Sequence, residues 1–183
     1  MATSSKTLTY EEWLALPEVE GVEEVVNGEI RIMPPNKWNH TRVVEALARQ
    51  LIARLSPEET YVVTSVFGLV VRREPLALRV PDLAVFRADQ IVEHDGYIHS
   101  APELVVEVLS PANTRSERTG KLQDYESLGV PEVWVVSPEA QTVEVLLLNQ
   151  DRSLVTTSLL RDGQLKPARF PEASVDIVAI WPK

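Results

Sequence analysis

Two acidic residues lie in strongly apolar stretches of the sequence, where they are candidates for binding a cation. Glu107 sits inside residues 104–109, a run apolar enough to be buried on both faces of a sheet. An ionised carboxylate is costly to bury unless it meets a positive charge. Asp82 begins a second apolar run, residues 82–86, directly after Pro81. If these runs form neighbouring strands, the carboxylates converge, and two such oxygen ligands completed by water suit Mg²⁺ or Mn²⁺.

Lys121 is the candidate cationic side chain for the same site. It shares a helical face with Tyr125 and Leu128, at spacings i+4 and i+7, and this is the face expected to pack on the sheet. A lysine there could orient an attacking water or stabilise negative charge growing on a phosphoryl group. A purely structural Glu107–Lys121 ion pair, with Asp82 capping a strand, predicts the same positions, so both interpretations stay open.

Other polar residues carry weaker signals. His40 begins a predicted long helix and could hydrogen-bond a phosphate, assist proton transfer or simply cap the helix. Glu24 could add a third carboxylate, although six other glutamates occur within residues 11–29. His94 and His99 have no zinc-site spacing, and we expect them to be structural or exposed.

Several enzyme classes are disfavoured by what the sequence lacks. It contains no GxSxG elbow, and no base is identifiable for Ser110, which disfavours a serine hydrolase. No phosphate-binding glycine motif occurs, which disfavours a nucleotide hydrolase. A two-carboxylate glycosidase built on Asp82 and Glu107 would leave Lys121 unexplained.

Length and composition indicate the number of domains, the possible metal ligands and the location of the protein. The chain has 183 residues and a near-average apolar share of 44%, which predicts one domain over residues 1–183, with residues 1–6 loose. It has no cysteine, so any metal must be held by oxygen or imidazole. No secretory signal is visible and no run approaches the roughly 18 apolar residues that cross a bilayer, which predicts a cytoplasmic protein without a membrane partner.

The net charge is the main argument against a nucleic-acid partner. It is −9, whereas phosphate-binding surfaces normally carry a basic excess. The charge is uneven, because residues 36–79 hold seven lysines and arginines against four glutamates. A local basic face therefore remains possible.

Hydrophobic periodicity and turn residues predict the elements that position these side chains. A capping box at Thr9 predicts a short helix over residues 8–16, and Asn27-Gly28 predicts a β-hairpin over residues 22–33. Further helices are expected over residues 40–55 and 119–128, the second ended by Gly129. Predicted strands are residues 61–73, 78–86, 103–110, 132–137, 142–148, 153–160 and 175–180. The fold class is therefore α/β, with a mixed sheet flanked by helices, an N-terminal hairpin and extra C-terminal strands.

A set of ordered motifs extends over about residues 8–148. It comprises Glu24-Val-Val-Asn-Gly-Glu29, Met33-Pro34, His40, Pro81-Asp82-Leu-Ala-Val, Pro102-Glu-Leu-Val-Val-Glu107-Val-Leu-Ser-Pro111, Lys121-x-x-x-Tyr125 and Gly129-Val-Pro-Glu-Val-Trp134. In order and spacing this set resembles the Uma2 family, a domain of unknown function that looks like a branch of the PD-(D/E)XK nuclease superfamily. Its members are commonly labelled restriction endonucleases.

The resemblance implies roles for five residues. It implies Asp82 and Glu107 as metal ligands, Lys121 as the catalytic lysine, and Glu24 and His40 as supporting residues. It also implies a restriction-endonuclease-like core, a sheet flanked by helices. The superfamily's usual lysine, two residues after the second acid, is replaced here by Leu109. In this family a lysine from the following helix takes its place, and Lys121 matches that position.

Three functional hypotheses follow. The first is a Mg²⁺- or Mn²⁺-dependent endonuclease acting on DNA, in which Arg115 or Arg118 contacts phosphate. The second is a catalytically inactive nuclease fold that binds nucleic acid or protein. The third is an acidic module that docks a basic partner through residues 11–29. Residues 143–148 also predict homo-oligomerisation, because an exposed strand edge pairs readily with another chain.

Overall fold

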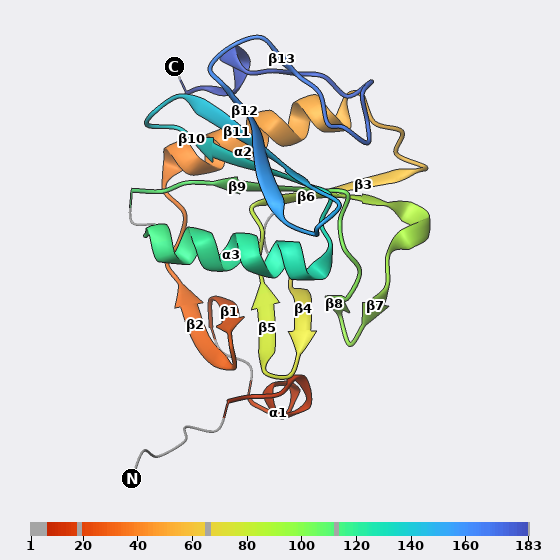
Figure 1. Cartoon of the computed structure of the whole chain (residues 1–183). Helices are drawn as coiled ribbons and strands as arrows, with labels where there is room; N and C mark the ends of the chain where they lie inside the picture. Colours follow the sequence, from red (N-terminus) through yellow and green to blue (C-terminus); the bar gives the residue numbers. More distant parts are fainter. Residues whose placement is uncertain (1–6, 18–19, 65–66, 112–113, 183) are drawn as a thin grey trace.

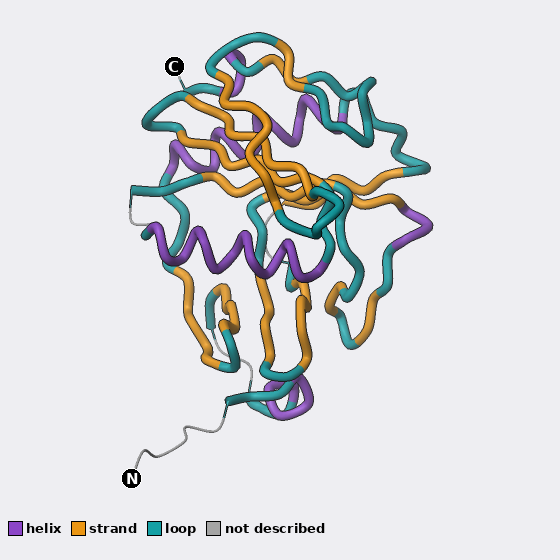
Figure 2. Tube along the Cα trace, viewed as in Figure 1, coloured by secondary structure: helices purple, strands orange, loops and turns teal. Residues whose placement is uncertain are grey.

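Two six-stranded sheets form the framework of the protein, and helix α3 (Arg115–Leu128) lies between them (Figure 1). The structure is a computed structural model that describes residues 7–17, 20–64, 67–111 and 114–182. Figure 2 shows α3 running between the strands of one sheet above it and those of the other sheet below it. The helix is therefore placed to carry side chains that both sheets can reach.

The central sheet contains the strands that bear the two acidic candidates. Its strand order is β12-β11-β10-β9-β6-β3. The β9–β10 pair is parallel and the other pairs are antiparallel, so the sheet is mixed, as predicted. In the same order, the strands span Leu154–Leu160, Thr142–Leu148, Glu132–Ser137, Leu104–Val108, Leu83–Arg87 and Thr60–Thr64.

The second sheet, here called the outer sheet, has the order β2-β1-β5-β4-β8-β7. In that order its strands span Glu29–Met33, Val22–Val26, Leu76–Arg79, Leu69–Arg73, Tyr97–Ile98 and Glu93–His94. Helix α1 (Tyr10–Leu14) closes the end of this sheet that is far from α3 (Figure 1). There Tyr10 is fully buried against apolar residues of the outer sheet.

Helix α2 (Trp38–Ile52) covers the face of the central sheet opposite α3. Its apolar stripe, including Val43, Leu47 and Leu51, is fully buried against side chains such as Leu83 and Val106. Burying each such side chain contributes about 1.5–3 kcal/mol, which is why the amphipathic pattern decides the position of this helix. The prediction of 40–55 is confirmed, with both ends displaced by two or three residues.

Helix α3 connects β9 to β10 and makes a β-α-β unit. It starts at a capping box between Thr114 and Glu117, earlier than the predicted 119, and ends at Gly129. Gly129 has φ 91°, a left-handed conformation that favours glycine. Because β9 and β10 are parallel, their carboxyl ends meet at one edge of the sheet.

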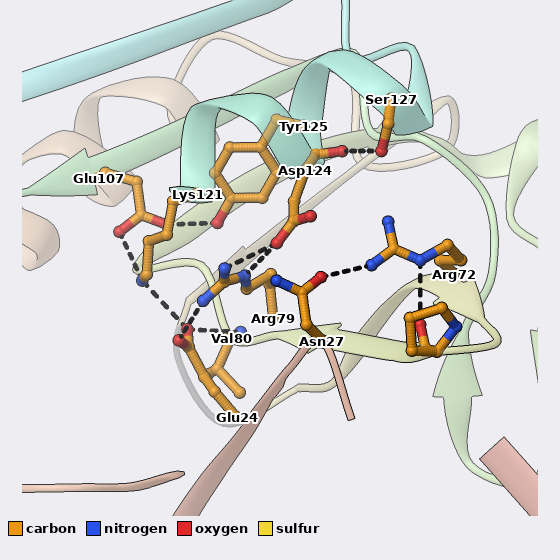
Figure 3. A network of polar contacts seen from close by, with 11 residues as sticks. Glu24, Asn27, Arg72, Arg79, Val80, Glu107, Lys121, Asp124, Tyr125 and Ser127 are labelled. Carbon is orange, nitrogen blue, oxygen red and sulfur yellow. Dashed lines mark hydrogen bonds and ion pairs between the residues drawn. The ribbon is translucent and has the colours of Figure 1, made fainter. Parts of the chain in front are cut away.

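The N-terminal turn predictions are confirmed. Thr9 and Glu12 make the predicted capping box at α1. Asn27 and Gly28 have φ values of 51° and 78°, and the β1–β2 hairpin closes around them. The hairpin places Glu24 on a strand next to β5, where its side chain faces the region under α3 (Figure 3).

The two long strands predicted over 61–73 and 78–86 are each divided between the two sheets. The first run becomes β3 and β4, and the second becomes β5 and β6. The second break falls at Pro81, which has no N–H to offer to a ladder. Near the first break a Cβ on Gly68 would lie 2.6 Å from the Tyr97 ring, so only glycine lets the chain pass there.

The C-terminal segment packs against α2 instead of extending the central sheet. The predicted strand 175–180 is wrong beyond residue 176. The short β13 (Gln164–Leu165) pairs with β14 (Val175–Asp176), and the 3₁₀ turn η2 (Val178–Ile180) follows. Another 3₁₀ turn, η1 (Ala88–Gln90), follows β6.

The strand predicted as an exposed edge, β11, lies inside the central sheet, and the edge strand is β12. Within the described residues, no helix is both long and apolar enough to cross a membrane.

Candidate active site

Asp82 and Glu107 lie on neighbouring segments, as the sequence predicts. The β6–β9 register pairs Leu83 with Val106, so Asp82 and Glu107 occupy the next position towards the strand end. Asp82 Oδ2 accepts a hydrogen bond from the backbone N–H of Val108 at 2.7 Å, which holds this carboxylate against the end of β9.

Glu107 is buried, and its two carboxylate oxygens have different partners on α3. Lys121 Nζ donates to Oε2 at 2.9 Å, and the Tyr125 hydroxyl donates a short hydrogen bond to Oε1 (Figure 3). Burial raises the pKa of Glu107 to about 7; the Lys121 charge lowers this pKa and the Asp82 charge raises it. Near neutral pH, a small change in the surroundings therefore decides whether Glu107 is ionised.

Lys121 links this strand to the outer sheet. Its Nζ also lies 3.1 Å from Glu24 Oε1, so one ammonium bridges β9 and β1 from the middle of α3. Burial alone would lower the pKa of Lys121, but the charges of Glu107, Glu24 and Asp82 hold this pKa above its usual value. The lysine is therefore a permanent positive charge in the site.

Glu24 is 2% exposed and is held by the outer sheet as well as by Lys121. Arg79 on β5 donates from Nη1 to Glu24 Oε2 at 3.0 Å, and from Nε to Asp124 Oδ2 at 2.7 Å. The backbone N–H of Val80 donates to Glu24 Oε1 at 3.1 Å. Figure 3 shows these charges as one chain of contacts from β1 through β5 to α3.

His40 lies in the first turn of α2 and contacts Asp82, not the Lys121 network. Its Nε2 is 3.1 Å from Asp82 Oδ2, and the side chain is 6% exposed. Its Nδ1 is buried without a hydrogen-bond partner in the described part of the chain. His40 is therefore a partner of a candidate metal ligand, more than a helix cap.

The network lines a small cleft beneath the first turns of α3. Its cavity volume is about 50 Å³, room for a few water molecules. The lining includes Glu24, Glu107 and Lys121, with Arg31 and Arg118 among the remaining residues. Asp82 and His40 adjoin this group through Val108 but are not part of the lining.

The two predicted phosphate-binding arginines differ in position. Arg118 lines the cleft and makes an ion pair with Glu144 on β11. Arg115, the first residue of α3, is exposed and does not line the cleft. Arg31, on the exposed strand β2, lines the cleft although its sequence position carries no signal for a site.

The donor set fits a hard divalent cation that keeps much of its water shell. Across the described residues, no three His, Cys, Asp or Glu side chains are grouped to hold a metal ion. Two carboxylates, Asp82 and Glu107, lie close enough for one charge to raise the pKa of the other, and a cation between them would relieve that repulsion. A carboxylate has about four lone-pair positions, so the bonds from Lys121 and Tyr125 leave capacity on Glu107.

Sequence reasoning missed Arg79, Asp124 and the bond from Tyr125 to Glu107. Arg79 ends the apolar strand Leu76–Arg79 and is 4% exposed. Like Glu107, Arg79 is a charged residue in an apolar run, and its burial requires partners of opposite charge. The helical spacing predicts that Tyr125 lies on the inward face of its helix, but spacing does not identify a partner for its hydroxyl.

Several charged residues of the acidic and basic segments have partners within the fold. In the acidic segment, Glu11 pairs with Arg73, Glu12 caps α1, and Glu23 accepts a hydrogen bond from the Trp13 indole. Glu24 is buried in the site. In the basic stretch 36–79, Arg79 is buried in ion pairs with Glu24 and Asp124.

Comparison with known proteins places the fold and the family. A solved structure from Anabaena variabilis, described as "a putative nuclease belonging to DUF820", matches with a TM-score of 0.78 at 22% identity, over 95% of this chain and 97% of that chain. This likeness shows the fold. No curated protein matches the chain. The model of the Uma2 family, described as "Putative restriction endonuclease", matches residues 9–177. The chain therefore belongs to the Uma2 family.

Proposed function

We propose that this protein is a Mg²⁺- or Mn²⁺-dependent endonuclease that hydrolyses phosphodiester bonds in DNA. The observation that carries the proposal is Lys121, a buried ammonium held between Glu107 and Glu24 and beside a second acid, Asp82. The descriptions of the family and of the similar solved structure support the same reaction class.

Asp82 and Glu107 would hold the metal ion in this proposal. A bound divalent cation polarises a phosphoryl oxygen and lowers the pKa of a water molecule. His40 orients Asp82 through the 3.1 Å contact with Oδ2. Tyr125 orients Glu107 in the same way through its short hydrogen bond. Both acids thus keep one position while substrate enters.

Lys121 stabilises charge at the reacting phosphate. An ammonium has three N–H bonds, and the contacts with Glu107 and Glu24 account for two of them. The third is available to an attacking water or to a phosphoryl oxygen on which negative charge develops. Arg31 and Arg118 line the same cleft, and they would contact the flanking phosphates. Arg115 supplies a further exposed charge at the start of α3.

Calorimetric titration with Mg²⁺ or Mn²⁺, followed by a DNA-nicking assay on the same samples, tests the proposal. We expect Asp82→Ala and Glu107→Ala to lose both metal binding and nicking. We expect Lys121→Ala to bind metal and lose nicking. Glu103→Gln is the matched control, because Glu103 precedes β9 and pairs with Arg87 away from the cleft; this variant should behave as the wild type.

Absence of metal binding by the folded wild type at millimolar concentration would refute the proposal. The Glu107–Lys121 contact would then be a structural ion pair within an inactive nuclease fold. That fold would serve as a nucleic-acid-binding or protein-interaction module. Metal binding without nicking would refute the catalytic role alone.

We also propose that the protein self-associates through the edge strand β12. Its outer side has no partner strand in the described chain, and Val155 and Leu159 are 46% and 63% exposed. An apolar strand edge of this kind pairs readily with a second copy. Light scattering after size exclusion should give a dimer or larger species for the wild type and a monomer for Leu159→Lys. Val178→Lys, on an equally exposed residue away from this edge, should change nothing.

A further inference from the structure

A second pocket lies beside the candidate active site, where α2 begins and where β9 and β10 end. Its cavity volume is about 640 Å³. It is lined by Lys37, Trp38 and His40 of α2, by Ser110 after β9 and by Ser137 after β10, among other residues. Leu109 lines both this pocket and the smaller cleft, so the two are adjacent. The pocket is far larger than the cleft.

Two polar features lie at this pocket, the N-terminus of α2 and the side chain of His40. The N-terminus of α2 is capped by Lys37 without a side-chain hydrogen bond, and its first turn contains no acidic residue. Its backbone N–H groups therefore favour an anion. Independently, His40 lines the pocket, and its buried Nδ1 has no partner among the described residues. Since Nε2 contacts Asp82, Nδ1 is turned away from that acid.

Trp38 adds a flat aromatic surface to the same pocket. Its side chain is 72% exposed, the largest exposure among the bulky apolar residues that the structure describes. An exposed indole next to a lysine and a helix N-terminus matches the pattern of single-strand binding sites, in which bases stack on aromatic rings and phosphates contact cationic groups. Glu139 also lines the pocket, so a phosphate belongs at the α2 end, near Lys37.

We propose that this pocket binds an unpaired nucleotide of the DNA substrate, with its base stacked on Trp38 and its phosphate at Lys37 and the N-terminus of α2. The proposal rests on the proposed nuclease function, because the strand then continues past Leu109 to Asp82 and Glu107. It specifies the substrate class as DNA with an unpaired segment, such as a single strand, a flap or a gap. A continuous duplex keeps its bases stacked on one another and offers none to Trp38.

Binding of a short fluorescent oligothymidine, measured by anisotropy in EDTA, tests this site without any cleavage. We expect Trp38→Ala to weaken affinity about tenfold, from the loss of one stacked base, and Trp38→Phe to retain most of it. Tyr61→Ala, which removes an exposed aromatic of β3, is the matched control and should leave affinity unchanged. Lys37→Ala should weaken binding and reduce its salt dependence.

A duplex of the same length is the comparison ligand in this experiment. Wild-type protein should bind the single strand more tightly than this duplex. Equal affinity of Trp38→Ala and wild type, tighter binding of the duplex, or no binding of any oligonucleotide would each overturn the proposal.

The nicking assay separates this inference from the proposed function. Nicking that depends on Glu107 but not on Trp38 would refute the pocket and leave the nuclease standing. Single-strand binding that depends on Trp38, in a protein that never nicks DNA, would refute the nuclease and leave the pocket standing.

Discussion

Lys121 Nζ lies 2.9 Å from Glu107 Oε2, and this contact joins the helix between the two sheets to the strand that carries the buried acid. The same nitrogen reaches Glu24 on the outer sheet at 3.1 Å. One side chain thus neutralises acids from both sheets. Removal of this cation therefore leaves two buried carboxylates with less compensating charge.

Replacing Lys121 with methionine should lower the free energy of unfolding by about 3 kcal/mol at pH 8, because breaking a buried ion pair leaves uncompensated charge. The loss should be smaller at pH 5, where Glu107 is protonated. Urea denaturation at both pH values measures the effect. Lys166→Met, at an exposed position, is the control. A double variant with Glu107→Gln should recover part of the loss; strictly additive effects would argue against the coupling.

The raised pKa of Glu107 predicts a particular pH dependence of stability. With a pKa of about 7 in the folded state against 4.5 in the unfolded state, the folded protein holds this proton more tightly. The contribution of this bound proton to the free energy of unfolding is therefore complete below about pH 4.5. It is lost as the pH rises through 7, on the order of 3 kcal/mol in total. The free energy of unfolding of the wild type minus that of Glu107→Gln should therefore decline over this interval. A difference that rises with pH would contradict the raised pKa.

Tyr125→Phe should raise the pKa of Glu107 further, because the hydroxyl hydrogen bond favours the ionised acid. The pH-dependent decline in stability should therefore move to higher pH, alongside a loss of about 1–3 kcal/mol from the buried hydrogen bond. Denaturation across pH 5–9 checks both effects. Tyr61→Phe, on the exposed strand β3, should change neither quantity. An unshifted pH profile would show that the hydroxyl does not tune this acid.

Arg79→Lys should destabilise the fold although the charge is kept. The guanidinium contacts Glu24 and Asp124 from different nitrogens, and a lysine cannot reproduce this forked geometry. We expect a loss of about 1.5–3 kcal/mol, the usual contribution of a hydrogen bond to a charged group. Arg169→Lys, whose side chain is 61% exposed in its ion pair with Glu103, is the matched control and should leave the midpoint of thermal unfolding unchanged. Equal effects of both variants would contradict the buried network.

Local sequence signals were sufficient for elements whose cause is local. Asn27-Gly28 specified the hairpin because both residues adopt positive φ readily, and the apolar stripe of α2 specified its buried face. The start of α3 was predicted too late, at 119 instead of 115, because apolar spacing alone does not include the capping box of Thr114 and Glu117. The division of residues 61–73 and 78–86 between two sheets could not be predicted from the sequence, because the alternation of apolar residues does not determine which strands pair.

The sequence by itself determined that Asp82, Glu107 and Lys121 are the candidates for chemistry, because charged residues in apolar surroundings must find partners once buried. Only the tertiary structure decided what those partners are. It brought Arg79 and Glu24 from the outer sheet and Tyr125 from α3 to the same network, and it placed Trp38 and His40 beside it. These contacts join residues far apart in the chain, so they depend on how two sheets and a helix pack, which no local pattern encodes.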